Sequence, residues 1–243
     1  MSLDQVKPVL DILELFASPC GFEFHPFLVG WYNDTVQEKF RLDYPQDALA
    51  VCIVSKPCFF EKTFVPYLTS RGDDIQPDKD PLDQCIAAKF SEIRTSLSEY
   101  AVDVIHDFEL HDNVRRPKVL VQTAGHVSGA AFYYQKSHVV DQPWGEKRVY
   151  GVSIHPTYGG WFGFRGTLLF RDLVVPSLTR VEPVDILKNE EKITLLENFN
   201  YHWRNWAYRD IIPVAEKYSE LQKRYFEMKP SERGEIIKEI QGL

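Results

Sequence analysis

Residues Ala48-Leu49-Ala50-Val51-Cys52-Ile53-Val54 form an uninterrupted apolar run that ends at Ser55-Lys56-Pro57. A short run of this kind, without polar residues at alternate positions, predicts a strand that is buried on both faces. Such a strand belongs inside a sheet that other elements cover. The rest of the chain must therefore supply neighbouring strands and covering helices.

Two helices are predicted around this strand. The first ends near Gly21, with Pro8 in or near its first turn, and its apolar residues at helical spacing are Leu3, Val6, Leu10 and Leu13. The second begins at Asp80-Pro81, because an aspartate can cap a helix and proline suits its first position, while Asp83 lies near the positive end of the helix dipole. Its buried stripe consists of Ile86, Phe90, Ile93 and Leu97.

Further strands are predicted in the middle of the chain. The extended segments cover residues 102–110, 118–122, 148–154 and 161–170. A turn at Asp112-Asn113 separates the first two segments, and residues 156–160 are predicted to join the last two as a hairpin.

From about Asn189 the apolar spacing becomes helical. This pattern continues through Trp203 and Trp206, returns over residues 214–228 after Pro213, and precedes a last short helix that Ser231 is predicted to cap. We therefore predict an α+β fold in which a mixed antiparallel sheet is covered by helices. The prediction is one domain over residues 1–243, with a helical C-terminal portion from about residue 189.

Composition limits the class of protein. The chain has 243 residues, 44% of them hydrophobic, and a net charge of −7. This content supports a folded core, and the acidic balance argues against a nucleic-acid carrier. The cysteines, Cys20, Cys52, Cys58 and Cys85, contain no C-x-x-C pair and are predicted to be buried free thiols. With no secretory signal or membrane-spanning run, we predict a soluble cytoplasmic protein.

Several common chemistries are absent from the sequence. It contains neither G-x-G-x-x-G nor G-x-x-x-x-G-K-[ST], and the histidines form no H-E-x-x-H motif. The segment Gly151-Val152-Ser153-Ile154-His155 lacks the final glycine of a nucleophile elbow. We therefore expect no metal site made by protein side chains and no side-chain nucleophile.

Three clusters favour a large flat ligand. Residues 126–131 are mostly small and lead into Tyr133-Tyr134-Gln135, whose polar groups could orient a ligand. Residues 158–166 combine aromatic rings with glycines and Arg165, and residues 200–210 interleave tryptophans with arginines. Tight helix packing, an aromatic hairpin and an ordinary helical core are the alternative explanations of the three clusters, and the spacing of the tryptophans favours the helical core. If they bind ligands, the ligands are a bulky conjugated molecule and an anionic partner.

A longer set of motifs runs in collinear order from about Gly21 to Arg233. It includes Arg115-Arg116-Pro117-Lys118, Gln122-Thr123-Ala124 with His126-Val127, Tyr133-Tyr134-Gln135, Pro143-Trp144-Gly145, Ile154-His155-Pro156, Gly159-Gly160-Trp161-Phe162, Phe199-Asn200 with His202-Trp203-Arg204, and Tyr208-Arg209-Asp210. This set resembles one family, the cblC-type cobalamin-processing proteins. The resemblance implies a flavin-nitroreductase-like version of the α+β fold that binds vitamin B12 with its lower base detached from cobalt.

The resemblance also implies two activities. One is reductive removal of cyanide from cyanocobalamin, with reduced FMN or FAD or a partner reductase as electron donor. The other is transfer of the alkyl group of alkylcobalamins to glutathione. The glutathione-binding residues that it implies are Arg165, Arg209 and Arg233. The cobalamin contacts that it implies are Asp107, Val119, Leu120, Val121, Gln122, Tyr133, Tyr134, Gln135, Ser153 and Phe164.

Other interpretations stay open. A flavin-dependent nitroreductase-type oxidoreductase could use the same flat cavity, although the sequence shows no evident basic cluster for a flavin phosphate. A non-catalytic cobalamin escort is the third alternative. His126 begins an H-x-x-G segment like that of cobalt-ligating motifs, but Ala124 stands where those motifs carry an orienting aspartate. The resemblance suggests a cblD-type adapter protein and methionine synthase as partners, and no nucleic acid or membrane.

Overall fold

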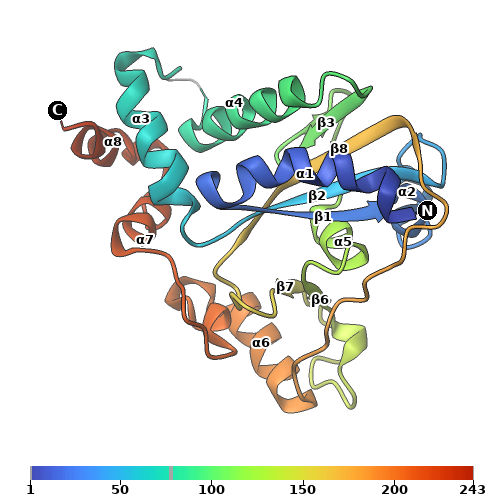
Figure 1. Ribbon diagram of the computed structural model, residues 1–243. Helices are drawn as coiled ribbons and strands as arrows, with labels where there is room; N and C mark the ends of the chain where they lie inside the picture. Colours follow the sequence, from blue (N-terminus) through green and yellow to red (C-terminus); the bar gives the residue numbers. More distant parts are fainter. Residues whose placement is uncertain (1, 77–78, 243) are drawn as a thin grey trace.

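The computed structural model describes residues 2–76 and 79–242 and has a four-stranded antiparallel sheet at its centre (Figure 1). The strand order is β1 (Phe22–Leu28), β2 (Ala48–Ser55), β8 (Gly163–Val174) and β3 (Val102–His106). Two small antiparallel ribbons join β4 (Leu110–His111) to β5 (Val114–Pro117) and β6 (Phe132–Tyr134) to β7 (Val152–Ile154). The predicted α+β class with antiparallel strands is confirmed.

Strand β2 is buried along its whole length, as its apolar sequence predicts. Because side chains alternate between the two faces of a strand, successive residues of β2 point into two different hydrophobic cores. Leu49, Val51 and Ile53 face the first core, whereas Ala50 and Cys52 face the second. One strand thus holds two layers of the molecule together.

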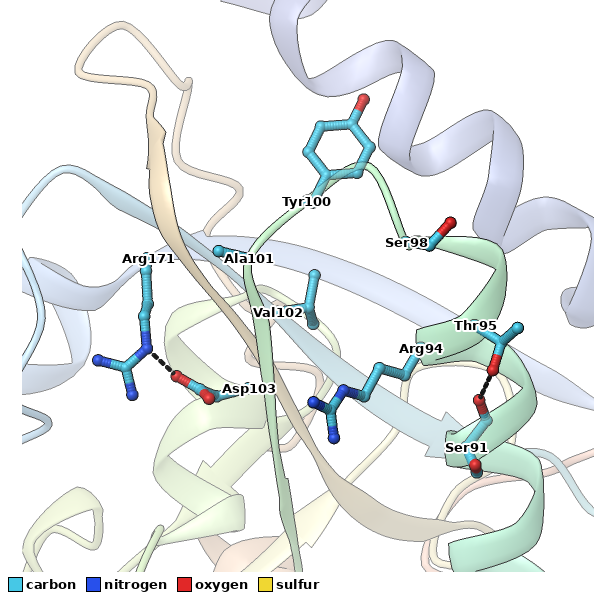
Figure 2. A pocket seen from close by; sticks show the side chains of 9 residues that line it. All are labelled: Ser91, Arg94, Thr95, Ser98, Tyr100, Ala101, Val102, Asp103 and Arg171. Carbon is cyan, nitrogen blue, oxygen red and sulfur yellow. Dashed lines mark hydrogen bonds and ion pairs between the residues drawn. The ribbon is translucent and has the colours of Figure 1, made fainter.

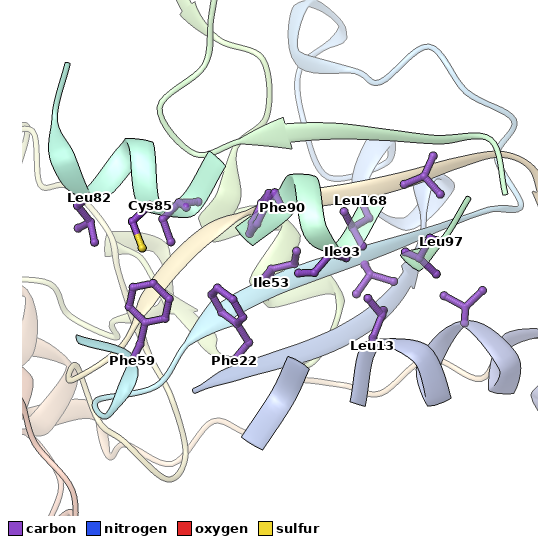
Figure 3. Close-up of a cluster of buried hydrophobic side chains, with 14 of the residues drawn as sticks. Leu13, Phe22, Ile53, Phe59, Leu82, Cys85, Phe90, Ile93, Leu97 and Leu168 are labelled. Atoms are coloured by element: carbon purple, nitrogen blue, oxygen red, sulfur yellow. The ribbon is translucent and has the colours of Figure 1, made fainter. Parts of the chain in front are cut away.

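Helices cover the first face of the sheet (Figures 1 and 3). They are α1 (Ser2–Cys20), α3 (Val65–Arg71), α4 (Pro81–Ser96), α7 (Glu220–Glu227) and α8 (Gly234–Gln241), with a π-helical turn at Phe60–Phe64. Val6 and Leu13 of α1 are buried in this core, while the side chain of Leu3 lies outside the described residues. Pro8 lies inside α1, one turn further from its start than predicted.

The predicted start of α4 is confirmed. The Asp80 carboxylate accepts a hydrogen bond of 2.8 Å from the Leu82 N–H, and Pro81 is the first helical residue. This cap satisfies one of the amide donors that every helix start leaves free. The predicted stripe of Ile86, Phe90, Ile93 and Leu97 lies in the first core. Figure 3 shows the last three of these side chains.

The second face carries shorter elements. Helices α2 (Val29–Asn33) and α5 (Val121–Val127) pack on it, and the β6–β7 ribbon and α6 (Asn189–Tyr201) form a third hydrophobic cluster further out. The remaining turns are 3-10 helices at Glu38–Phe40, Gly72–Asp74, Lys136–His138, Trp203–Asn205, Ala207–Asp210 and Pro230–Glu232.

Two strand predictions in the middle of the chain are wrong. Residues 118–122 are not a strand, because the chain is irregular up to Leu120 and α5 begins at Val121. The apolar residues there bury themselves against the sheet without joining it. The predicted hairpin of residues 148–170 is also absent from the described residues, since β7 pairs with β6 and β8 pairs with β2 and β3.

The C-terminal helices are shorter than predicted. Helix α6 ends at Tyr201, and Trp203 lies in a 3-10 turn. Trp206, which has a positive φ of 63°, separates this turn from the next one. Helix α7 begins only at Glu220, where the Ser219 side chain caps it. Ser231 lies in a 3-10 turn, and α8 starts after Arg233. Aromatic spacing alone therefore overestimated helix length.

Phe90 gives a test of the first core. Its ring is 1% exposed and packs against Phe22 and His106. Phe90→Ala is expected to lower the free energy of unfolding by about 3–5 kcal/mol, because a large cavity replaces the ring. Urea denaturation measures this loss. The exposed neighbour Ser91, changed to Ala, is the control and should shift stability by less than about 0.5 kcal/mol; equal losses would contradict the assigned core position.

Candidate functional site

A cavity of about 930 Å³ lies at the end of β8 that begins with Gly163. We call it the main cavity. Three segments distant in sequence form its walls: residues 162–165, 203–209 and 226–233, with Asp107 beside them. Its cationic lining residues are Arg165, Arg204, Arg209, Lys229 and Arg233, against the acidic Asp107 and Glu227. The predicted glutathione-binding arginines are thus brought to one cavity, although they are up to 68 positions apart.

A β-bulge delivers two of the lining side chains. Ile53 of β2 pairs with Gly166 of β8, but the next residue, Val54, pairs with Phe164. Arg165 is therefore the extra residue of the bulge, and bulges re-aim side chains next to functional sites. As a result Phe164 and Arg165, consecutive in sequence, both line the main cavity.

Arg165 keeps most of its hydrogen-bonding capacity. Its Nε donates to the Ser55 hydroxyl at 2.8 Å, and its guanidinium lies 5.7 Å from the centre of the Phe59 ring. A Cβ on Gly163 would come within 2.8 Å of its Nη2, so glycine at this position leaves room for the guanidinium. Among the described residues no carboxylate lies within ion-pair distance of Arg165. Two planar Nη donors remain for a carboxylate ligand.

Arg209 is held by aromatic rings and by the backbone. Its guanidinium lies 5.0–5.7 Å from the ring centres of Trp161, Trp206, Tyr208 and Tyr218. Its Nη1 also donates to the Gly160 carbonyl, while its buried Nε has no hydrogen-bond partner. Cation–π contacts of this kind fix a guanidinium without neutralising it. Arg209 therefore contributes positive potential from a fixed position.

Arg233 belongs to the third wall segment and already has an acidic partner. Its Nη1 donates to Asp80 at 2.8 Å, and its Nε donates to the Tyr225 carbonyl. The ion pair also connects the cavity to the start of α4, which Asp80 caps. Of the predicted arginines, Arg233 is the one whose charge is most nearly balanced.

Two carboxyl groups near these arginines titrate abnormally. Burial, together with the Asp80 and Asp107 carboxylates, raises the pKa of Asp83 to about 6. Burial also raises the pKa of Asp107, although Arg165 opposes the shift. Carboxyl groups that lie close to one another and beside cations are typical of functional sites. In such places burial and neighbouring charges shift the pKa away from its value in water.

Smaller cavities continue from the main one. A cavity of about 160 Å³ shares Phe162, Phe164, Tyr208 and Arg209 with it, and meets a cavity of about 440 Å³ at Gln122, Gly151 and Phe199. A third, of about 240 Å³, adjoins the latter at Gln122 and Tyr133. The series makes an extended cavity system suited to a ligand longer than any single chamber.

Most predicted cobalamin contacts line this system. Those that do so are Asp107, Leu120, Gln122, Tyr133, Gln135, Ser153 and Phe164. Ser153 is 7% exposed, and its hydroxyl has no hydrogen-bond partner although it lines a chamber. A buried hydroxyl without a partner costs free energy unless a ligand or water satisfies it. It is therefore available to a polar group of a ligand.

Three predicted contacts have side chains elsewhere. Val119 and Val121 pack in the second core. Tyr134 is fully buried in the third cluster, where its hydroxyl donates to Asp185 at 3.0 Å. In this conformation these residues line none of the cavities described above.

The small residues around Gly125 serve packing. Ala124, Val127, Ala130 and Ala131 lie in the second core, and a Cβ on Gly125 would overlap the Phe164 ring. The small-residue segment thus supports the ring that lines the cavity. His126 lines none of these cavities, and its Nδ1 accepts a hydrogen bond of 3.1 Å from the Tyr133 N–H.

A separate groove of about 660 Å³ lies between α4 and the edge strand β3 (Figure 2). It is lined by Arg94 and hydroxyl side chains of α4, and by Arg171, which pairs with Asp103 at 2.6 Å. None of the predicted contact residues is among its described lining residues. It is open and polar, and it does not connect with the main cavity through any shared residue.

Sequence reasoning missed one cluster, made by Glu23, His25 and His155. Its only sequence signal is a carboxylate and a histidine at alternate positions of a strand that is otherwise largely apolar. The cysteine prediction is confirmed in part: all four are free thiols, but only Cys52 and Cys85 are buried. No helix among the described residues is long and apolar enough to cross a bilayer.

The comparisons identify the class of protein. Residues 21–237 match the sequence model of the methylmalonic aciduria and homocystinuria type C family, and the chain belongs to this family. The crystal structure of the Caenorhabditis elegans B12-trafficking protein CblC, a homologue of human MMACHC, superposes with a TM-score of 0.85 at 31% identity, covering 98% of this chain and 97% of the other.

Relatives with a named activity are closer in sequence. The Gallus gallus protein called cyanocobalamin reductase / alkylcobalamin dealkylase is 49% identical over 220 residues, which is 90% of this chain and 91% of the relative. The Homo sapiens protein of the same name is 45% identical, over 88% of this chain and 76% of the relative. The family resemblance expected from the sequence is confirmed.

Gly125→Ala tests the contact between α5 and the cavity wall. The added methyl group would overlap the Phe164 ring, so we expect a loss of about 1–3 kcal/mol in unfolding free energy from overpacking. Thermal and urea denaturation measure it. Gly234→Ala, at a position with open space around it, is the control and should be neutral or stabilising. A neutral Gly125→Ala would show that the ring moves freely.

Asp83→Asn tests the crowded carboxyl groups. Because the raised pKa makes the folded protein bind this proton more tightly than the unfolded chain, Asp83 lowers stability as pH rises from about 4 to about 6. The amide should therefore stabilise the fold by on the order of 1 kcal/mol at pH 7.5, after discounting for solvent screening, and by much less at pH 4. Urea denaturation at pH 4 and pH 7.5 measures the unfolding free energy, with the exposed Asp34→Asn as control. A gain in stability that is the same at both pH values would contradict the raised pKa of Asp83.

Proposed function

We propose that this protein processes cobalamin, removing the cyano ligand of cyanocobalamin by reduction and the alkyl group of alkylcobalamins by transfer to glutathione. The observation that carries the proposal is the main cavity with its adjoining chambers, whose walls include seven of the ten predicted cobalamin contacts and all three predicted glutathione-binding arginines. Family membership and the names of the relatives support the same activity.

The corrin would lie along the chambers that Phe164, Gln122 and Tyr133 line. Aromatic rings give a flat apolar surface, and the Gln122 amide and the Ser153 hydroxyl can orient the amide groups at the corrin edge. We propose that the protein binds cobalamin with the lower base detached. In this conformation His126 is not available to replace the lower base as a cobalt ligand. It lines none of these chambers, and its Nδ1 accepts a hydrogen bond from the Tyr133 backbone N–H.

Glutathione would lie in the main cavity. Its two carboxylates match planar guanidinium donors, and Arg165 offers two free Nη groups. Arg209 and Arg233 would add positive potential, which favours the thiolate over the thiol. The thiolate attacks the cobalt-bound carbon, a sulfur–carbon bond forms, and the cobalt–carbon electron pair stays on the metal as Co(I). The protein supplies position and charge, and no side chain acts as a nucleophile.

Decyanation needs electrons in place of a thiolate. Detachment of the lower base removes an axial donor, which makes Co(III) easier to reduce, and a reduced FMN or FAD or a partner reductase would supply the electrons. We propose that the fold is a nitroreductase-like one adapted to cobalamin in a single domain. A cytoplasmic location and contact with a cblD-type adapter and methionine synthase are parts of the same proposal.

A flavin-dependent oxidoreductase is the second candidate. The sequence shows no evident basic cluster for a flavin phosphate, but the structure gathers five cationic side chains around the main cavity. These cations suit a phosphate as well as a carboxylate. The third interpretation, a non-catalytic escort, requires the same cobalamin binding without turnover.

Absorption spectra separate the three candidates. Cyanocobalamin and methylcobalamin are each mixed with the protein, with and without glutathione, and FMN is titrated separately. We expect a base-off spectrum on binding and turnover of methylcobalamin only with glutathione. A base-off spectrum without turnover under either condition indicates an escort, and tight FMN binding with unchanged cobalamin spectra indicates the oxidoreductase.

Arg165→Ala tests the division of roles inside the cavity. Loss of a charged hydrogen bond to glutathione is expected to weaken glutathione use by about 1–3 kcal/mol, read as kcat/KM for glutathione, while the Kd of cobalamin stays unchanged. Arg94→Ala, in the separate groove beside β3, is the matched control and should change neither quantity. Equal losses of cobalamin and glutathione affinity would show that Arg165 does not act on glutathione specifically.

A further inference from the structure

The Glu23 carboxylate joins β1 to the loop of residues 155–160. Its Oε2 accepts hydrogen bonds of 3.1 Å from both His25 Nε2 and His155 Nε2, and its Oε1 accepts one of 2.9 Å from the Tyr158 hydroxyl. Burial alone would raise the pKa of Glu23, but hydrogen bonds from His155, His25 and Tyr158 outweigh it and hold that pKa well below its usual range. Glu23 is thus an ionised group in a half-buried position.

The hydrogen-bond directions distinguish this cluster from a metal site. The ligand atoms of Glu23, His25 and His155 lie within 4.8 Å of one another, as a bound cation would require. However, His155 Nδ1 accepts hydrogen bonds from the backbone N–H groups of Thr157 and Tyr158, at 3.1 and 3.3 Å. The ring proton must then lie on Nε2, where it points to Glu23. A metal-ligating histidine normally has the reverse arrangement, with its other nitrogen as a donor.

The loop itself is closed by its backbone. His155 and Gly159 exchange two backbone hydrogen bonds, of 2.8 and 3.0 Å, and Gly159 has a positive φ of 58°. His155 is 4% exposed, and its ring stacks on Tyr158 with centroids 4.6 Å apart. Glu23 therefore holds a compact loop at two points, His155 and Tyr158.

The far side of this loop holds Arg209. The Gly160 N–H donates to the Arg209 carbonyl at 3.0 Å, and the Arg209 guanidinium donates back to the Gly160 carbonyl. A Cβ on Gly160 would approach the Arg209 Cα to 2.7 Å, so the two backbones are in direct contact. The loop continues into Phe162, a lining residue of the main cavity. The connection from Glu23 to the cavity is continuous.

We infer that Glu23 is a positioning residue for the glutathione-binding part of the main cavity, acting through the residue 155–160 loop on Arg209. The inference rests on the proposed function. Glu23 lines none of the described cavities, so it does not touch the substrate there. A loop that is no longer fixed to β1 would leave Arg209 free to sample positions that do not fit glutathione.

Glu23→Gln tests this inference. The amide keeps the size of the side chain but removes the charge and replaces one acceptor oxygen with a donor, so the contact with His155 or with Tyr158 is weakened or lost. We expect the KM for glutathione in methylcobalamin dealkylation to rise about tenfold, the equivalent of one charged hydrogen bond, with kcat at saturating glutathione nearly unchanged. The Kd of cobalamin should stay as in the wild type. Tyr158→Phe should raise the same KM by a smaller factor.

His25→Gln is the matched control. His25 bonds the same carboxylate but belongs to β1, so its loss leaves both loop contacts in place. It should leave the KM for glutathione unchanged. If Glu23→Gln and His25→Gln raise KM equally, or if Glu23→Gln lowers kcat and cobalamin affinity together with it, Glu23 is a general stabiliser and the inference is wrong.

A readout that needs no substrate completes the test. Hydrogen–deuterium exchange of the full chain should become faster in residues 155–162 of Glu23→Gln and stay unchanged in His25→Gln, because the Gly159, Gly160 and Trp161 amides are hydrogen-bonded only while the loop is fixed. Unchanged exchange overturns the inference, as does Zn²⁺ binding in calorimetry that Glu23→Gln abolishes. If the wild-type protein does not turn over methylcobalamin with glutathione while exchange changes as expected, the proposed function fails and the positioning of Arg209 by Glu23 stands.

Discussion

The pairing register between β2 and β8 is the constraint on which the candidate site depends. Gly166 of β8 lies opposite both Ile53 and His106, and a Cβ there would overlap the Ile105 carbonyl of β3. Strand β8 is therefore held closely on both sides at this residue. The extra residue of the bulge must fall immediately before it, at Arg165. A slip of one residue would turn every side chain of β8 to the opposite face and remove the cation from the cavity.

Sequence predicted the elements whose signals are local. Strand β2 needs only its own apolar residues, and α4 needs only the cap of Asp80 and the stripe that Phe90 belongs to. The predictions for residues 118–122 and for the 148–170 hairpin are wrong because apolar character does not specify which segments pair in a sheet. Val119 is buried in the second core without belonging to a strand. Strand β7 pairs with β6 and not with β8, the next strand in the sequence. Burial is a property of composition, whereas pairing depends on the whole topology.

The candidate site was predictable only through the family resemblance. Arg165, Arg209 and Arg233 lie on a strand bulge, a 3-10 turn and the start of a short helix, and no spacing rule connects such positions. Glu23 was missed for a related reason. The role of the Glu23 carboxylate becomes visible only when the loop that carries His155 is known to lie against β1. Residues that act through distant partners leave little trace in one sequence.

The three arginines differ in what balances their charge, and this difference explains how the cavity can hold an anion. Arg233 pairs with Asp80, Arg209 is surrounded by neutral rings, and Arg165 contacts a neutral hydroxyl. A cation whose direct contacts are neutral groups keeps much of its field, although the nearby Asp107 carboxyl group interacts with Arg165 and offsets part of the field there. A carboxylate that bound Arg165 would gain that field without displacing a directly paired acidic side chain. In the proposed complex with glutathione, the same field would reach the thiol and favour its ionised form, so that one arrangement of charges would serve both binding and activation of the sulfur.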